Sequence, residues 1–194
     1  MPEASPAVIV FLIGVGGFTL AAAVSDLRRR KIPNKMTLPM FLAGLVYQIA
    51  FGGWSGLAEG HYAAAGLKSA LLAFALGFGT LFILWMVGGG GGGDVKLMGA
   101  LSVWLGFRLT FMVMIASTVF VLMGTLAVLL WSMVSRGPWA TKRKYLVESE
   151  KPKTKRGKVA GETLEQRQQR RIMAYAVPVA LATWAIVLWR LPQL

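Results

Sequence analysis

Two aspartates are the side chains of this sequence that are best suited to chemistry. The chain has no cysteine and one histidine, His61, which leaves out thiol catalysis, cysteine-ligated zinc and histidine-rich metal sites. Eight residues are acidic and only two of them are aspartates, Asp26 and Asp94, each at one end of a long apolar stretch. Two carboxylates that share a site can supply both the base and the acid for hydrolysis, because like charges in contact do not both ionise easily.

Asp94 follows a run of six glycines, residues 88–93. A bare glycine backbone lets an extended substrate segment approach closely and offers it N–H and C=O partners. We expect this role for Gly91 and Gly93, and a flexible tether for the earlier glycines. Simpler interpretations stay open, because Asp94 can cap a helix that begins just after it, and Asp26 can pair with the arginines that follow it.

The residues around the two aspartates form two motifs, D-x-R-x3-I-P-N and G-x-G-D-x-K. The first consists of Asp26, Arg28, Ile32, Pro33 and Asn34, and the second of Gly91, Gly93, Asp94 and Lys96. Together and in this order, the motifs resemble those of the type IV prepilin peptidases, which are membrane aspartic peptidases of the GxGD type. The similarity extends from about residue 8 to about residue 188, and the stretch 171–178 is similar to the start of the family's last helix.

The resemblance implies a function for the whole chain, 1–194, as one integral membrane peptidase domain. Such an enzyme cuts the short basic leader from a type IV pilin-like (prepilin) precursor at the cytoplasmic side of the inner (plasma) membrane, with Asp26 and Asp94 as catalytic residues and no cofactor or metal. Gly91, Gly93 and Lys96 are the expected substrate contacts. Larger members carry a cysteine-containing zinc region and methylate the new N-terminus. Because this sequence has no cysteine, we expect peptidase activity without methyl transfer.

The two aspartates are predicted to differ in their electrostatic surroundings. Asp94, at a helix N-terminus, feels the positive end of the helix dipole, which favours its ionised form and makes it the expected base. Asp26, at a helix C-terminus, feels the negative end, offset by its arginines, and is the expected acid. Arg28 and Ile32 are expected to be structural parts of the first motif, and Pro33 with the asparagine after it to fix the turn into the second helix.

Membrane helices must position these side chains, because the composition is that of a membrane protein. Charged residues make up 15% of the chain, against about 25% in a soluble domain. Apolar stretches, uncharged except for Lys68, predict an all-α bundle of about six transmembrane helices, within residues 7–25, 36–58, 62–87, 97–107, 109–135 and 172–189. The fourth stretch alone reaches only about 16 Å, so we expect its helix to include Val95 and Lys96 and to continue past Arg108.

The distribution of positive charge predicts the orientation. The net charge is +13, and the loop 136–171 holds 12 of the 21 Lys and Arg residues. With the loops 26–36 and 88–96 it holds 18 of them, so these loops are expected to face the cytoplasm and both termini the outside. The basic loop is expected to contact anionic lipids, with docking of pilus or secretion assembly machinery as an alternative. It lacks the stacking aromatics of a nucleic-acid site.

Other uses of two membrane carboxylates stay open at this point. Presenilin-type peptidases also carry G-x-G-D, but serine replaces their tyrosine before Asp26, and their Pro-Ala-Leu motif is absent. A proton-coupled carrier would use the carboxylates as a relay, and a non-catalytic membrane assembly factor would not need them. Only a peptidase requires that replacement of either aspartate by asparagine abolish cleavage while precursor binding survives.

Overall fold

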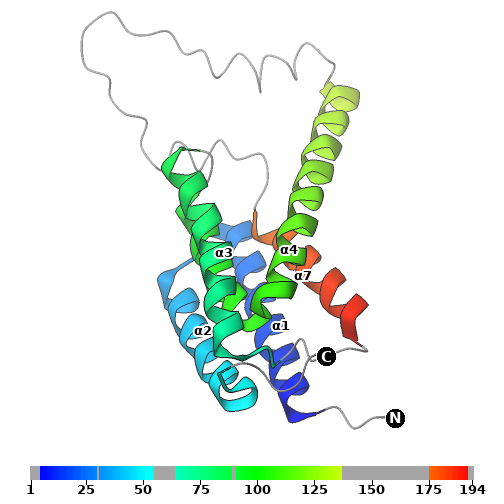
Figure 1. Cartoon of the computed structure of the whole chain (residues 1–194). Coiled ribbons are helices and arrows are strands. Elements are labelled where there is room, and N and C mark those ends of the chain that lie inside the picture. Colours follow the sequence, from blue (N-terminus) through cyan, green and yellow to red (C-terminus); the bar gives the residue numbers. More distant parts are fainter. Residues whose placement is uncertain (1–4, 30, 55–63, 89–90, 137–174, 192–194) are drawn as a thin grey trace, which may run out of the picture. The chain divides into compact units, whose positions relative to one another are not determined.

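The computed structural model describes residues 5–29, 31–54, 64–88, 91–136 and 175–191, and the regular structure within them is helical, without strands. The elements are α1 (Pro6–Arg29), α2 (Asn34–Tyr47), the π-helical turn η1 (Gln48–Gly52), α3 (Gly66–Met86), α4 (Gly92–Arg136) and α7 (Ala176–Arg190), labelled in Figure 1 where there is room. The chain divides into two compact units, Met1–Phe120 with Ala174–Leu194, and Val121–Met173. The first unit holds both aspartates. Of the second, the structure describes only the last part of α4.

The boundaries of α1 and α2 place the first motif. α1 continues one turn beyond the predicted span, so Asp26 lies inside the helix, and Arg28 and Arg29 occupy its last turn, where positive charge suits the helix dipole. Pro33 has an extended backbone and is the residue before α2, which begins at Asn34. Pro33 and Asn34 thus lie at the entry to the second helix, where the turn is predicted.

Gly106 breaks α4 and reverses the chain. Its φ of 67° and ψ of 175° are not helical. The hydroxyl of Thr110 donates to the carbonyl oxygen of Ser102 at 3.3 Å, eight residues earlier, whereas eight residues of continuous helix would separate them by about 12 Å. A Cβ on Gly106 would also lie 2.7 Å from the Cβ of Ala65. The expectation that one helix continues past Arg108 is therefore wrong, because only glycine accepts this conformation and this space.

The first arm of α4, residues 92–105, is the centre of the core. Its apolar side chains are almost completely buried, among them Val95, Leu97, Met98, Leu101, Val103, Trp104 and Leu105. The indole of Trp104 stacks on Tyr47 with ring centres 4.9 Å apart and donates to the carbonyl oxygen of Met40 at 2.8 Å. A Cβ on Gly14 of α1 or Gly44 of α2 would lie 2.6 Å from this indole. Small residues on two helices thus leave room for one large ring.

A buried glutamine secures the end of this arm. The side-chain amide of Gln48, which is fully buried, donates to the carbonyl oxygens of Val103 and Trp104 at 3.2 and 3.0 Å. Its oxygen accepts the N–H of Gly66, the first residue of α3, at 2.9 Å. Gln48 therefore satisfies carbonyls that the break at Gly106 frees from the helical pattern.

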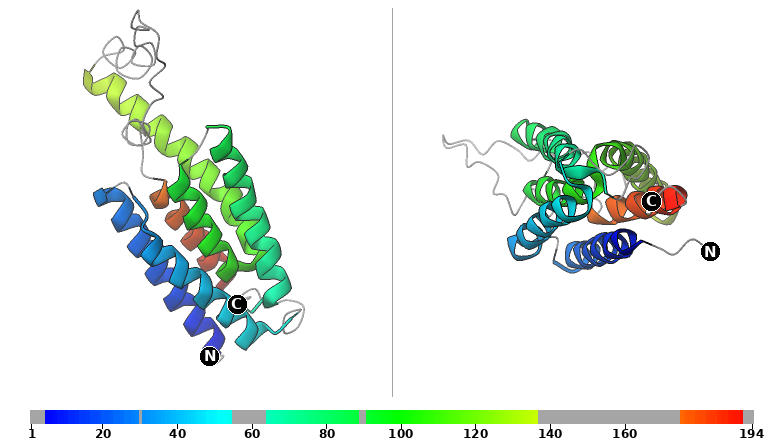
Figure 2. Two further views of the ribbon diagram at one scale, coloured as in Figure 1. Left: turned by 90° about the vertical axis from the view of Figure 1, so that its left-hand side faces the viewer. Right: turned by 60° about the horizontal axis from the view of Figure 1, so that its bottom comes forward.

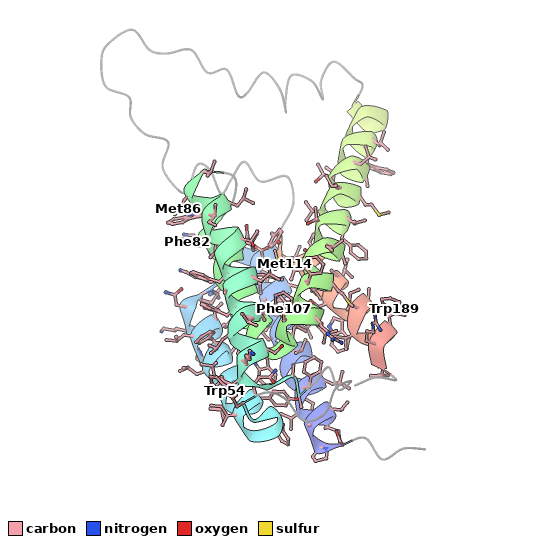
Figure 3. All side chains as sticks on the ribbon, viewed as in Figure 1. Trp54, Phe82, Met86, Phe107, Met114 and Trp189 are labelled. Carbon is pink, nitrogen blue, oxygen red and sulfur yellow. The ribbon has the colours of Figure 1, made fainter. Side chains whose placement is uncertain are left out.

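The outside of the helices is apolar, as in a membrane protein. Three helical stretches are long and apolar enough to cross a bilayer, Pro6–Arg29, Gly66–Met86 and Gly92–Val128, and α7 is a shorter apolar helix. Figure 3 shows Phe82 and Met86 on the outer side of α3 and Trp189 on the outer side of α7, and Met86 and Trp189 are 68% and 66% exposed. Exposed apolar surface of this extent suits lipid rather than water. The described part of the chain is thus all helical and has the surface of a membrane protein.

Candidate active site

Asp26 lies where α1 ends and α7 begins. Its side chain is buried, with 5% of its surface exposed. Its Oδ2 atom accepts the main-chain N–H of Ala176, the first residue of α7, at 2.9 Å, although the two residues are 150 positions apart. A carboxylate that accepts an N–H at a helix N-terminus is stabilised both by the hydrogen bond and by the helix dipole. Asp26 thus ties the end of the first helix to the start of the last.

Asp94 is held by its own turn of helix. It is the third residue of α4 and is 8% exposed. Its Oδ2 atom accepts the N–H of Gly91 at 3.3 Å, and its own N–H donates to the carbonyl oxygen of Gly91 at 2.9 Å. In a capping box, the side chain of the third helical residue accepts the N–H of the residue before the helix, and Asp94 makes this hydrogen bond. The helix therefore begins earlier than expected, at Gly92, and Asp94 does not precede it as an N-cap but accepts the N–H of Gly91 from inside the first turn.

The first and second motifs meet through Ile32 and Gly93. Ile32 is buried in the core, and a Cβ built on Gly93 would lie 3.8 Å from the Cβ of Ile32. The hydroxyl of Ser25 donates to the carbonyl oxygen of Lys31 at 2.9 Å, which closes the segment between α1 and α2 back onto α1. The end of α1, the start of α4 and the start of α7 consequently lie at the same end of the helices, the upper end in Figure 1 and in the left view of Figure 2.

This arrangement changes the electrostatic comparison between the two aspartates. The expected assignment of Asp94 as base and Asp26 as acid depended on placing them at opposite kinds of helix end. The structure places the carboxylate of Asp26 against the N-terminus of α7 as well as at the end of α1. Both carboxylates therefore accept an N–H at a helix N-terminus, and the dipole difference no longer separates acid from base.

The remaining motif residues lie around this end of the helices. Arg28, Pro33, Asn34 and Lys96 are exposed, and Gly91 is partly buried. Of the glycine run, residues 89–90 lie outside the described residues, as does nearly all of the basic loop 136–171. No group of three or more His, Asp or Glu side chains that could hold a metal occurs in the described part of the chain.

Two neighbours of the aspartates were not predicted from the sequence. The N–H of Ala176 is a main-chain group, which no residue type signals, although the stretch 171–178 was singled out by resemblance. Trp85, near the end of α3, packs beside the glycines, since a Cβ on Gly92 would lie 3.7 Å from its indole nitrogen. Trp85 thus lies beside Gly92, which is two residues before Asp94 in α4, and no pattern in the sequence indicates this proximity.

Comparisons with known proteins point to one family. Residues 9–130 match the model of the type IV leader peptidase family, and this region contains both aspartates. The chain is 32% identical over 133 residues to a prepilin leader peptidase/N-methyltransferase of Dickeya chrysanthemi, covering 63% of this chain and 44% of that protein. A protein of the same name from Xanthomonas campestris is 34% identical over 47% of this chain and 30% of its own length. One from Escherichia coli is 31% identical over 52% of this chain and 43% of its own length.

The chain therefore spans less than half the length of the curated relatives that it matches. No solved structure gives a significant match.

Proposed function

The chain belongs to the type IV leader peptidase family, and we propose that it is a membrane aspartic endopeptidase that removes the short basic leader from a type IV pilin-like precursor. The observation that carries the proposal is the junction of the two motifs. A Cβ on Gly93 would be in van der Waals contact with Ile32, so the segment after Asp26 passes close to the residue before Asp94. Both carboxylates are buried at the same end of the helices, each oriented by a main-chain N–H.

The two carboxyl groups are proposed to work as one pair that shares a proton. The ionised member takes a proton from water while the water oxygen attacks the carbonyl carbon of the scissile peptide bond. The protonated member gives its proton to the leaving nitrogen as the C–N bond breaks, which yields the leader with a new carboxyl end and the precursor with a new amino end. The pair has then exchanged roles and still holds one proton, so acid and base are properties of the pair.

The start of α4 is proposed to receive the segment that is cut. Gly91 and Gly93 flank Asp94 with bare backbone, which allows an extended segment to pass close to the carboxylate. Because Gly91 also donates to Asp94, substrate pairing at Gly91 would act directly on the orientation of that carboxylate. Lys96 is exposed two residues further on, where its ammonium group can contact the substrate or lipid headgroups.

The proposed orientation in the membrane follows from charge. We propose six crossings with both termini outside, which places the loops holding 18 of the 21 basic residues, and the aspartates, at the cytoplasmic side of the inner membrane. Three apolar helices of sufficient length and the reversal of α4 at Gly106 support this arrangement. The basic loop 136–171 is proposed to contact anionic lipids and, in a pilus or secretion system, assembly partners.

The proposal is tested by mass spectrometry of a full-length prepilin co-expressed with this protein. We expect loss of the leader with the wild-type protein, an intact precursor with Asp26→Asn or Asp94→Asn, and co-purification of the precursor with both variants. Glu3→Gln, the same kind of change at an acidic residue outside the motifs, is the matched control and should process fully. Full processing by either aspartate variant would contradict the proposal, whereas a carrier or an assembly factor predicts that the wild-type protein itself leaves the leader in place.

A further inference from the structure

Ala176, the first residue of α7, donates a hydrogen bond to Asp26. On the basis of the proposed function, we propose that the main-chain N–H of Ala176 is a positioning group for Asp26, so that α7 forms part of the catalytic centre and does more than cross the membrane. The donor and the acceptor are 2.9 Å apart, and Ala176 and Asp26 are 1% and 5% exposed. A buried main-chain donor of this kind is costly to leave without its acceptor.

The position of the donor is fixed by how α7 packs on α1. The indole of Trp184 donates to the hydroxyl of Thr19 at 3.2 Å. A Cβ on Gly16 would lie 2.7 Å from the same indole ring, so the two helices are in close contact there. Ala176 therefore cannot shift along α1 without disturbing this packing. The result is a rigid donor on one helix aimed at a carboxylate on the other.

The hydrogen bond has a specific consequence for chemistry. It engages Oδ2 of Asp26, which leaves Oδ1 for a water molecule or for the partner carboxyl group. It also selects the side-chain rotation that presents Oδ1. A catalytic pair needs its oxygens held within a fraction of an ångström of the productive geometry. Asp94 receives this support from its own turn, whereas Asp26 receives it from a helix 150 residues away.

Proline at position 176 removes this donor, and because Tyr175 before it has helical dihedrals of φ −67° and ψ −29°, it also disfavours the present backbone of that residue. Position 176 is the first residue of α7, where proline is well tolerated because that N–H has no partner within the helix. Ala176→Val is the matched control, because valine has the same number of side-chain carbons as proline and retains the N–H. Both variants carry the cost of added volume at a buried site, and only Ala176→Pro loses the hydrogen bond.

The activity readout uses purified protein and a full-length prepilin as the probe. We expect Ala176→Pro to lower kcat about 10- to 100-fold relative to Ala176→Val, with KM within about twofold, since hydrogen bonds to charged groups are of that strength. A general loss of folding would instead reduce the amount of active enzyme in both variants. Equal kcat values for the two variants, with Asp26→Asn inactive, would overturn the positioning role and leave the proposed function standing.

Thermal unfolding provides a second test that needs no activity. Asp26→Asn retains an oxygen that can accept the N–H of Ala176, and Asp26→Ala does not. We expect Asp26→Ala to unfold at a lower temperature than Asp26→Asn, and this difference to become smaller when each is combined with Ala176→Pro, because only the cavity contribution then remains. A difference of the same size in the combined variants overturns the proposal, as does equal stability of the two single variants. Processing by both aspartate variants would instead overturn the proposed function itself.

Discussion

Asp94 and Asp26 are held by the same kind of group but over very different distances in the sequence. Asp94 accepts an N–H from Gly91, three residues away in the same helical turn, and Asp26 accepts one from Ala176, 150 residues away. The hydrogen bond from Gly91 to Asp94 forms whenever the start of α4 forms. The hydrogen bond from Ala176 to Asp26 forms only when α7 has docked on α1. One member of the proposed pair is therefore set by local structure and the other by tertiary packing.

The largest expected effect comes from removing either carboxylate. Asp26→Asn and Asp94→Asn should each lower kcat/KM by about a thousandfold or more, because groups that act as a unit lose nearly all their effect when one is removed. The combined variant should be no slower than either single one. Kinetics of the three purified variants check this, and additive losses would show that the two aspartates act separately.

The next effect is on the contact that joins the two motifs. Ile32→Ala removes a buried side chain against Gly93 and should lower the free energy of unfolding by about 2–5 kcal/mol. Leu38→Ala, at a position 60% exposed, is the control and should change it by less than about 0.5 kcal/mol. Thermal unfolding in detergent measures both. If the two variants were equally stable, Ile32 would not be the link between the motifs.

A substitution at Gly16 tests the hydrogen bond from Ala176 to Asp26 without touching the one from Gly91 to Asp94. Gly16→Ala places a Cβ 2.7 Å from Trp184 of α7, whereas nothing lies within 4 Å of a Cβ on Gly17. Overpacking costs on the order of 1–3 kcal/mol, so we expect Gly16→Ala to lower kcat by about tenfold through a displaced α7. Gly17→Ala is the matched control and should keep wild-type activity. Equal activity of the two variants would mean that Asp26 does not depend on the docking of α7.

The smallest expected effect is at Lys96. Its side chain is exposed, and exposed charges contribute weakly. Lys96→Gln should raise KM by no more than about threefold and leave kcat unchanged, as steady-state kinetics at two salt concentrations will show. A large loss in kcat would instead place Lys96 beside the carboxylate of Asp94 during the reaction.

The parts of this account that the sequence could predict are those carried by local pattern. The sequence indicates both aspartates, their motifs and the turn at Pro33, because each is a pattern of a few consecutive residues. The apolar stretch that forms α1 was likewise visible, although the helix continues one turn further and encloses Asp26.

Features that depend on three-dimensional packing could not be predicted. The reversal at Gly106 depends on the approach of Ala65 and on the hydrogen bonds of Gln48, which come from other elements. The support of Asp26 by Ala176 involves a main-chain donor that every residue except proline possesses. The predicted dipole difference between the aspartates was incomplete for the same reason, since it considered α1 alone and not the hydrogen bond from the start of α7.

The most direct test of the central claim is a cross-link between positions 26 and 94. The chain has no cysteine, so Asp26→Cys with Asp94→Cys introduces the only two thiols, and a short thiol cross-linker reports whether they face each other. The account predicts efficient intramolecular cross-linking in membranes, and none for the control pair Asp26→Cys with Lys96→Cys, whose second side chain is exposed on α4. Failure of the first pair to cross-link, with and without bound prepilin, would contradict a shared catalytic site.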